Sequence, residues 1–189
     1  MNGDPQRWKE GLGVRTLRRI GIGESQIVLD FGCGEGWYTI PVVKIVGESG
    51  VVYAADQDRS ELDKLSSSLS SSDIDNCRLL FTKDLRIDLP DDHVDVVLLF
   101  DVLHYYYFTD RNDRIRLLRE LRRILKPEGI LSLYPKHLDA RSNPSMREVQ
   151  DELRGEGFHL VAKRGVTMIH EEILEETIVL NYQSRAHSA

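Results

Sequence analysis

The sequence predicts a doubly wound α/β fold: a mostly parallel sheet of seven strands, one of them antiparallel, with helices on both faces. Short apolar runs alternate with segments of helical spacing, which is the pattern of βαβ units. Residues 51–55 and 94–100 are apolar at nearly every position, as expected when helices cover both faces of a parallel sheet. The chain closes with two strands that no helix separates, and this connection makes one strand antiparallel.

Residues 4–20 form the first predicted helix. Asp4 offers a capping side chain, Pro5 suits the first helical position, and Gly21 ends the helix. Two internal glycines weaken it, because glycine loses more backbone freedom on folding than any other residue. We expect residues 1–24 to lie on the domain as an N-terminal helix and to act as a partial lid.

The middle of the chain alternates strands and helices. Pro41 falls in the first turn of one helix, where proline is tolerated. Leu62, Leu65 and Leu69 give the next helix an inward face. The expected strands are residues 27–31, 51–55, 78–82 and 94–100, and the expected helices are residues 38–46 and 59–70.

A long helix capped by Asp110 opens the last third of the chain, and Pro127 stops it. Asn143 and Pro144 open the next helix. An acidic connection, rather than a helix, joins the two closing strands. The expected helices are residues 111–125 and 143–154, the expected strands are residues 130–134, 158–163 and 177–182, and the acidic connection carries Glu171, Glu172, Glu175 and Glu176.

The composition fits one globular domain over residues 1–189, since the chain is long enough for one well-buried core and too short for two. A net charge of −6 argues against a broad nucleic-acid footprint. Cys33 and Cys77 make neither a zinc set nor a disulfide framework, so we expect reduced thiols and no metal site. The charged N-terminus lacks a signal-peptide pattern and no apolar stretch could span a bilayer, so a cytoplasmic protein is expected.

The segment most informative about a ligand is an acidic, glycine-rich turn directly after the first strand. It reads Asp30-Phe31-Gly32-Cys33-Gly34-Glu35-Gly36. Many nucleotide folds hold phosphate at such a turn on backbone N–H groups. An aspartate at the strand end repels phosphate, however, and suits a ligand that carries positive charge. Dinucleotide folds also need a third glycine three residues after the second, and here Trp37 stands at that position.

This turn resembles the first motif of the class I S-adenosylmethionine-dependent methyltransferases, which reads acid-x-G-x-G-x-G. Residues 121–129, Leu-Arg-Arg-Ile-Leu-Lys-Pro-Glu-Gly, resemble the family's L-x-x-x-L-K-P-x-G segment before the fifth strand. The resemblance covers residues 27–182 and points to the small-molecule type with a UbiE-like core. It implies a Rossmann-like methyltransferase fold, S-adenosylmethionine as the methyl donor, and S-adenosylhomocysteine as the product.

The resemblance assigns cofactor-binding residues to the ends of the first four strands. Asp30 would accept from the ammonium group at the methionine end, with Gly32, Cys33 and Gly34 around it. Asp56 ends the second strand, where a carboxylate can accept two ribose hydroxyls. A cap or turn role is the alternative for Asp30. The other expected contacts are Gln57 at the ribose, Asp84 and Leu85 at the adenine, and Phe100 beside the cofactor.

Asp101 and His104, which follow the fourth strand, are the candidate catalytic residues. In the resembled family this segment faces the methyl donor to the acceptor, and histidine titrates near neutral pH. A turn-capping role for His104 stays open. Residues 105–108, Tyr-Tyr-Tyr-Phe, either line a substrate pocket or cover the sheet edge. Lys136 and His137 replace the acid–amide pair of the metal-dependent catechol type; they either bind an anionic acceptor or are solvated, and we prefer the second.

An arginine-rich helix leaves two interpretations open, an RNA-facing surface or a solvated face with interleaved acids. We prefer the second because the whole chain is acidic. The arginines are Arg111, Arg114, Arg116, Arg119, Arg122 and Arg123.

No appended recognition domain is visible, so the expected partner is a small-molecule acceptor. A homo-oligomer stays open.

These observations favour an enzyme that transfers a methyl group to a small-molecule acceptor by in-line displacement. The leaving group is neutral, so a base matters only if the acceptor must lose a proton. A non-catalytic S-adenosylmethionine-binding sensor or partner subunit is an alternative, because the acceptor half of the site carries no motif. A NAD(P)-dependent oxidoreductase is a further alternative, against which Trp37 speaks.

Overall fold

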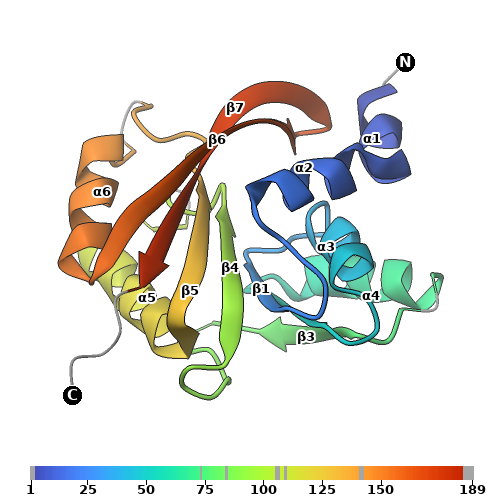
Figure 1. The fold of residues 1–189 in the computed structure, drawn as a ribbon, viewed down its shortest axis with the longest axis horizontal. Helices are drawn as coiled ribbons and strands as arrows, with labels where there is room; N and C mark the ends of the chain where they lie inside the picture. Colours follow the sequence, from blue (N-terminus) through green and yellow to red (C-terminus); the bar gives the residue numbers. More distant parts are fainter. Residues whose placement is uncertain are drawn as a thin grey trace.

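The computed structural model describes residues 3–72, 74–83, 85–104, 107–108, 110–140 and 143–184. Over these residues the strands are β1 (Ile27–Phe31), β2 (Val51–Asp56), β3 (Cys77–Phe81), β4 (Val94–Phe100), β5 (Leu125–Tyr134), β6 (Phe158–His170) and β7 (Ile173–Ser184). They form a seven-stranded sheet in the order β3-β2-β1-β4-β5-β7-β6 (Figure 1).

The direction in which the chain winds reverses between β1 and β4. From β1 the chain moves outward to β2 and β3, and it then returns to pair β4 with the other side of β1. The first five strands are parallel, whereas β7 runs antiparallel to β5 and to β6. The predicted fold class is therefore confirmed, and the switch point between β1 and β4 is where such sheets bind ligands.

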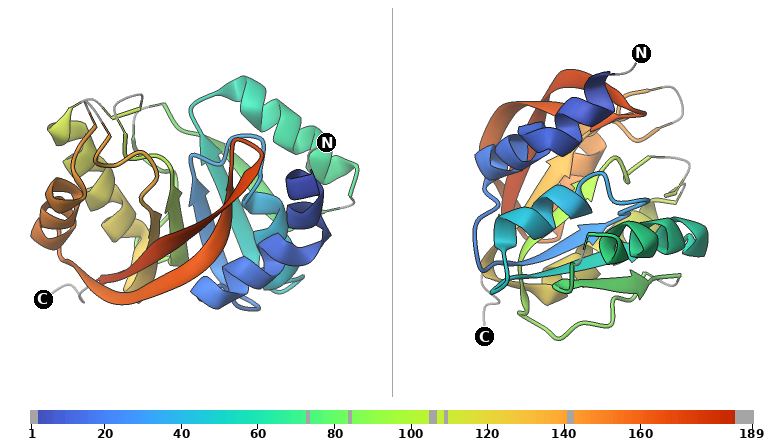
Figure 2. Two further views of the ribbon diagram at one scale, coloured as in Figure 1. Left: turned by 90° about the horizontal axis from the view of Figure 1, so that it is seen from above. Right: turned by 90° about the vertical axis from the view of Figure 1, so that its right-hand side faces the viewer.

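Helices cover both faces of this sheet (Figure 2). One face carries the N-terminal helices with α3 and α4, and the other carries α5 and α6. None of the described helices is long and apolar enough to cross a membrane. The helical elements are α1 (Gly3–Arg7), the π-helical turn η1 (Trp8–Leu12), α2 (Gly13–Ile20), α3 (Thr39–Val46), α4 (Arg59–Ser70), α5 (Arg111–Ile124) and α6 (Met146–Gly155).

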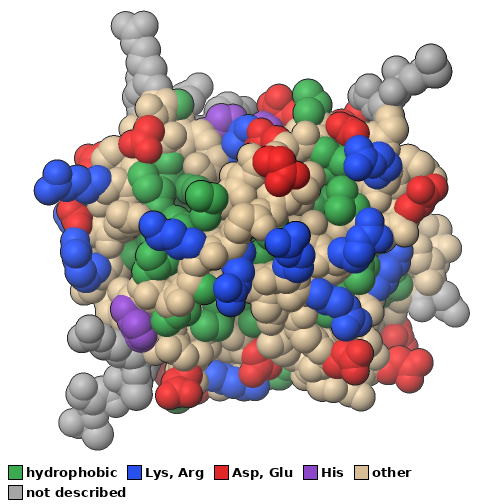
Figure 3. Space-filling model, turned by 45° about the horizontal axis from the view of Figure 1, so that its top comes forward, with side chains coloured by type: hydrophobic (Ala, Val, Ile, Leu, Met, Phe, Trp, Pro, Cys, Tyr) green, Lys and Arg blue, Asp and Glu red, His purple; other side chains and the backbone are tan. Residues whose placement is uncertain are grey.

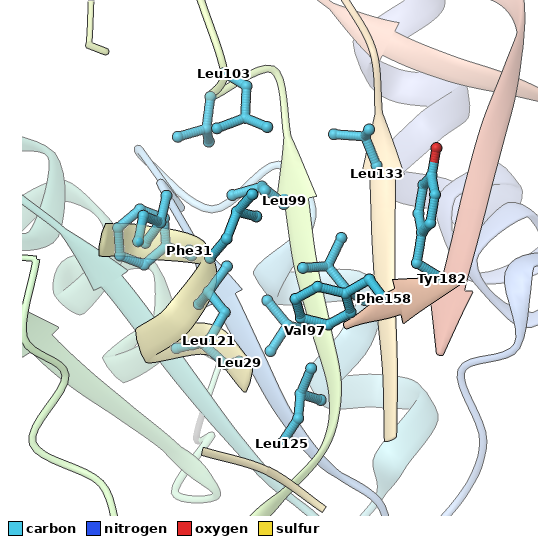
Figure 4. Close-up of a cluster of buried hydrophobic side chains, with 14 of the residues drawn as sticks. Leu29, Phe31, Val97, Leu99, Leu103, Leu121, Leu125, Leu133, Phe158 and Tyr182 are labelled. Atoms are coloured by element: carbon cyan, nitrogen blue, oxygen red, sulfur yellow. The ribbon is translucent and has the colours of Figure 1, made fainter. Parts of the chain in front are cut away.

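Neighbouring residues of β1 contact opposite cores, because successive side chains of a strand point to opposite faces. Leu29 and Phe31 join a cluster with Leu121 of α5 and Phe158 of β6, whereas Val28 joins side chains of α2 and α3. Figure 4 shows the first cluster filling the space between the sheet and α5. The residue between Leu29 and Phe31 therefore faces α3, and that residue is the acid of the glycine-rich turn.

The N-terminal helix is present, but it is interrupted. Gly11 has a φ of 140° inside η1, a conformation that glycine adopts without strain. Trp8 is the first residue of this interrupted segment. It is buried and donates from Nε1 to the carbonyl oxygen of Trp37 at 2.8 Å. The bend thus seats one indole against the chain that follows the glycine-rich turn.

The predicted starts of α6 and β5 were wrong. The helix expected from residue 143 begins at Met146, because Ser145 caps it. Ser145 accepts from the N–H of Glu148 at 3.2 Å and Glu148 accepts from the N–H of Ser145 at 2.7 Å, which forms a capping box. β5 begins at Leu125 instead of residue 130, because Leu125 already pairs with Val94 before a bulge.

The closing strands are longer than predicted and form one hairpin. Glu171 and Glu172, with φ of 46° and 64°, supply the two left-handed residues that a two-residue hairpin turn requires. Glu175 and Glu176 therefore lie within β7, and not in an acidic connection. The hairpin extends beyond the sheet toward α1 (Figure 1), where the N–H of Leu174 donates to Asp4 at 3.1 Å.

Most arginines of α5 pair with acids of the same protein. Arg114, 6% exposed, donates to both carboxylate oxygens of Glu152 on α6 at 2.7 and 2.9 Å. Arg119 makes the same two-bond contact with Glu156 at 2.9 and 3.1 Å. These pairs support an ion-paired helix face over an RNA-facing surface.

We expect the Arg114→Met substitution to lower the free energy of unfolding by about 3 kcal/mol, because it leaves the charge of buried Glu152 largely uncompensated. The double substitution Arg114→Met with Glu152→Met should recover much of that loss. Urea denaturation measures all three proteins. Arg116→Met removes an exposed pair with Asp113 and should cost less than about 1 kcal/mol. A double variant as unstable as the single one would contradict this account.

Candidate cofactor and acceptor site

Asp30 is a buried carboxylate at the switch point of the sheet. It is 1% exposed and accepts a hydrogen bond from Oγ1 of Thr39, the first residue of α3, at 2.6 Å. Burial raises the pKa of Asp30 to about 6; the hydrogen bond from Thr39 opposes this shift and the charge of Asp56 adds to it. No lysine, arginine or histidine within the described residues pairs with it. Such a carboxylate is suited to an ammonium ligand.

The glycines of the turn have different roles. A Cβ at Gly32 would lie 2.6 Å from Val102, and a Cβ at Gly36 would lie 2.5 Å from Leu65 of α4, so both positions need glycine for packing. A Cβ at Gly34 would meet nothing within 4 Å. Gly34 is therefore the position where a ligand can approach the main chain closely.

Cys33 contributes its backbone to this turn, and its side chain packs away from the surface. Its N–H and that of Gly32 donate to the carbonyl oxygen of Ala55 at 3.1 and 2.8 Å. The thiol lies among the leucines of α4, and burial raises the pKa of Cys33. Both cysteines are free thiols in the structure.

Asp56, at the end of β2, holds the turn in place. Its Oδ2 accepts from the N–H of Gly34 at 2.8 Å, and its Oδ1 accepts from the N–H of Asp58 at 2.9 Å. Each carboxylate oxygen has a second lone pair, so both can still accept from ribose hydroxyls. Gln57, the other residue predicted at the ribose, is exposed.

The predicted adenine end is described in part. Asp84 lies outside the described residues. Leu85 has a φ of 60° and packs its half-buried side chain against the core on the α5 side of the sheet. Directly after β3, the N–H of Thr82 donates to the carbonyl oxygen of Asp56 at 3.0 Å, which links the ends of β3 and β2.

Phe100, the last residue of β4, is 4% exposed and belongs to an aromatic cluster. Its ring makes edge contacts with Tyr38 at 4.9 Å and with Tyr134 at 6.3 Å between ring centroids. The cluster fixes the end of β4, and so it fixes the position of the residue that follows.

Asp101 carries the densest group of polar contacts at this end of the sheet. Its φ of 54° is left-handed, and its N–H donates to the carbonyl oxygen of Tyr134 at 3.3 Å. Its Oδ1 lies 2.8 Å from Nδ1 of His137, after β5, and its Oδ2 lies 3.0 Å from Nε2 of His170, at the end of β6. One carboxylate thus contacts two imidazoles from different elements.

His104, the second candidate catalytic residue, lies beside this group. Its ring makes edge contacts with His137 at 5.4 Å and with Tyr107 at 5.0 Å. Burial lowers the pKa of His104, although the charge of Asp101 opposes the shift, so the imidazole is neutral at pH 7. Tyr105 and Tyr106 lie outside the described residues. Phe108 belongs to the buried core, so its side chain does not line an open pocket.

Lys136 fits neither of its predicted roles. It donates to both carboxylate oxygens of Glu175 on β7 at 2.6 and 2.7 Å, and the hydroxyl of Tyr134 donates to the same carboxylate. Burial would raise the pKa of Glu175, but these hydrogen bonds prevail and hold it below its ordinary value. Lys136 is therefore part of a half-buried ion pair, and His137 is paired with Asp101.

Sequence reasoning missed His170 and Glu175, both on the closing hairpin. His170 lies 69 residues from Asp101 in the chain, and no local motif surrounds either residue. Only the length and direction of the hairpin bring them to the carboxyl ends of β4 and β5. Figure 3, which brings this end of the sheet forward, shows histidine, acidic and basic side chains side by side at the upper margin of the molecule.

Residues 28–129, more than half of the chain, match the family model of a methyltransferase domain. The chain belongs to the S-adenosylmethionine-dependent methyltransferases. The predicted family and cofactor are therefore confirmed. The fold agrees with that of an S-adenosylmethionine-dependent methyltransferase from Aquifex aeolicus, with a TM-score of 0.72 at 22% identity over 95% of this chain and 97% of the other.

This chain matches only part of the length of its curated relatives. A demethylmenaquinone methyltransferase of Geobacillus sp. (strain WCH70) is 28% identical over 125 residues, which are 65% of this chain and 49% of the relative. A ubiquinone/menaquinone biosynthesis C-methyltransferase UbiE of Vibrio vulnificus (strain YJ016) is 30% identical over 151 residues, 79% of this chain and 54% of the relative. The chain spans about half the length of the curated relatives it matches.

The Asp30→Asn substitution should weaken S-adenosylmethionine binding about 10- to 100-fold, since an amide cannot balance the ammonium charge. The affinity of the wild type should fall as pH drops through about 6, where Asp30 takes up its proton, and the affinity of the variant should not. Calorimetric titration between pH 5 and pH 8 measures both effects. Equal affinities of the two proteins at pH 7.5 would remove Asp30 from the cofactor site.

The same variant separates binding from stability. The pKa of Asp30 is raised in the folded protein, so folding binds a proton more tightly and the ligand-free wild type loses stability as pH rises from about 4 to about 6. The ligand-free Asp30→Asn protein should therefore be at least as stable as the wild type at pH 7. Thermal unfolding without cofactor checks this expectation, and a large destabilisation at pH 7 would show that the carboxylate serves folding.

Gly34→Ala and Gly36→Ala form a matched pair. Gly34→Ala has open space and a φ of 50°, which costs alanine about 1–2 kcal/mol, so the protein should fold and bind the cofactor weakly. Gly36→Ala meets Leu65 and should destabilise the fold by about 1–3 kcal/mol in addition to the cost of its φ of 95°. Thermal unfolding and calorimetry distinguish the two. Normal cofactor affinity of Gly34→Ala would exclude close approach of the ligand there.

Proposed function

We propose that this protein transfers the methyl group of S-adenosylmethionine to a small-molecule acceptor that loses a proton, by in-line displacement. The observation that carries the proposal is the carboxylate of Asp101, which lies directly after β4 and contacts two imidazoles. Asp101 follows the strand that pairs with β1, and β1 ends in the candidate cofactor turn. A donor subsite and a proton-accepting group therefore belong to adjacent strand ends.

The cofactor half of the proposal rests on three neighbouring features. Asp30 would accept from the ammonium group, the backbone at Gly34 would approach the methionine end, and Asp56 would accept from the ribose hydroxyls. Leu85 would form an apolar wall for the adenine, with Asp84 beside it in the sequence. A nicotinamide dinucleotide is disfavoured, because its diphosphate would face the buried carboxylate of Asp30.

The acceptor half favours an acceptor that is acidic. Methyl transfer from a sulfonium needs mainly correct placement of the two reacting atoms. A base accelerates the step only when the acceptor must give up a proton. A carboxylate that holds an imidazole in a fixed orientation stabilises the imidazolium that forms on proton transfer, and Asp101 is placed to do this for His137 or His170. His104 lies beside His137, and because burial lowers its pKa it would be a further proton acceptor.

An aromatic or enolic hydroxyl compound combines a small size with such a proton. The curated relatives are named for demethylmenaquinone and for ubiquinone and menaquinone biosynthesis, and a ring of that kind belongs to this acceptor class. We therefore propose a phenol, an enol or a quinol-type ring as the acceptor. Nucleic acid is not proposed, since the chain is acidic and the arginines of α5 are paired.

The N-terminal helices and the hairpin would cover the acceptor. Trp8 is bonded to Trp37 beside the glycine-rich turn, and Asp4 accepts from the hairpin residue Leu174. Thr16 donates to the carbonyl oxygen of Thr167 on β6 at 3.1 Å. Held by these contacts, the N-terminal segment would act as a partial lid, and a second copy of the chain would be an additional means of closing the site.

The Asp101→Asn substitution should reduce kcat about 10²- to 10⁴-fold and leave the affinity for S-adenosylmethionine within about 3-fold of the wild type, since proton acceptance and donor binding use different residues. The assay supplies donor with a labelled methyl group and a panel of small phenols and quinols. Glu172→Gln, at the tip of the hairpin, is the control and should retain wild-type turnover. Tight donor binding without labelled product from any acceptor would favour a non-catalytic sensor. Full turnover by Asp101→Asn would exclude Asp101 as a base.

A further inference from the structure

Two imidazoles on one carboxylate are more than proton transfer needs. A single histidine oriented by Asp101 would suffice as a base, yet His137 and His170 approach its two oxygens from separate elements. One possible ligand atom from each of the three residues lies within 4.8 Å of the others. The rings of His137 and His170 also contact each other, with centroids 4.9 Å apart.

We propose that Asp101, His137 and His170 form a binding site for a divalent first-row transition metal ion. Two imidazoles and one carboxylate are the donor set of zinc and non-haem Fe²⁺ sites, whereas Mg²⁺ and Ca²⁺ prefer oxygen ligands. Sequence analysis predicted no metal here, because it considered only cysteine sets and the acid–amide pair after the fifth strand. The three ligands are separated by 36 and 33 residues in the chain, so no ligand spacing could reveal them.

The distances within the group fit a metal site with little movement. Two ligand atoms that each lie about 2.1 Å from one ion, at angles of about 90° to 110°, are about 3.0 to 3.4 Å apart. Oδ1 of Asp101 lies 2.8 Å from Nδ1 of His137, and Oδ2 lies 3.0 Å from Nε2 of His170. An ion would therefore replace the two hydrogen bonds, and each imidazole would bind it through a nitrogen that carries no proton.

The backbone holds the ligands in position. Asp101 and His137 are both left-handed, with φ of 54° and 64°, which is a costly conformation for these residues. Asn143 donates from Nδ2 to the carbonyl oxygen of His137 at 2.7 Å. The hydroxyl of Tyr38 donates to the carbonyl oxygen of Ile169, next to His170. Each of the three ligands is thus anchored by a main-chain contact of its own or of its neighbour.

The group is accessible to an ion and leaves coordination positions open. The side chains of Asp101, His137 and His170 are 22%, 38% and 15% exposed. Three protein ligands leave at least one position for water or for an oxygen of another molecule, as in catalytic zinc sites. A hydroxyl compound bound there would lose its proton more readily, because the ion stabilises the anion. The ion would then take over the role that a base has in its absence.

The test uses the chain of residues 1–189 after treatment with a chelator, without methyl donor. Titration with Co²⁺, followed by visible absorption, should show bands of a low-symmetry site that saturate at one ion per chain, and Zn²⁺ should displace them. His137→Gln and His170→Gln should each weaken binding at least about 100-fold. His159→Gln, a histidine elsewhere on β6, is the matched control and should bind as the wild type does.

Folding and function are kept separate in this experiment. Thermal unfolding and S-adenosylmethionine affinity show whether each variant is folded, and a variant that fails this check is replaced by His170→Asn or His137→Asn. Absorption bands that persist in folded His137 and His170 variants, or no binding of Co²⁺ and Zn²⁺ at millimolar concentration, would overturn the proposal and leave a hydrogen-bonded His–Asp–His group. Neither result depends on methyl transfer, so loss of the proposed function and loss of the metal site are read independently.

Discussion

An unbalanced negative charge buried between two parallel strands is the constraint on which the arrangement of this molecule depends. Asp30 is removed from water at the end of β1, where only the hydroxyl of Thr39 partly compensates it. Leaving a carboxylate in such a place is expensive, and in the proposed complex a cationic amino-acid tail would offset the cost. The glycine turn, the start of α3 and Asp56 all surround this one group, while the strands around it stay packed.

The two proposed halves of the site, one for the donor and one for the acceptor, have different origins in the chain. The donor half comes from β1 and β2, within the region that matches the methyltransferase domain family. The acceptor half comes from the ends of β4 and β5 and from the hairpin, and His137, His170 and Glu175 all lie beyond residue 129. Family membership therefore fixes what is bound at the first strands, whereas the identity of the acceptor depends on side chains that the family pattern does not include.

The sequence predicted the parallel part of the fold because its signals are local. Buried runs in β2 and β4, the cap at Asp110, and the turn after Asp30 each need only a few neighbouring residues. The hairpin was underestimated because the missed parts of its strands, residues 164–170 and 173–176, include Arg164, Gly165, Glu175 and Glu176, so polarity does not mark the ends of the strands. The start of α6 was wrong because Pro144 is a strong local signal, while the reciprocal bonds of Ser145 and Glu148 decide the boundary. His170 could not be assigned at all, since its neighbours in space are remote in sequence.

The position of β7 between β5 and β6 has a consequence for the contact between His170 and Asp101. In the sheet, β6 pairs with β7, and β7 in turn pairs with β5. His170, at the end of β6, is therefore held beside Asp101 by a strand that follows it in the chain. The contact between these two side chains thus depends on the backbone pairing of β5 with β7, in which neither residue takes part.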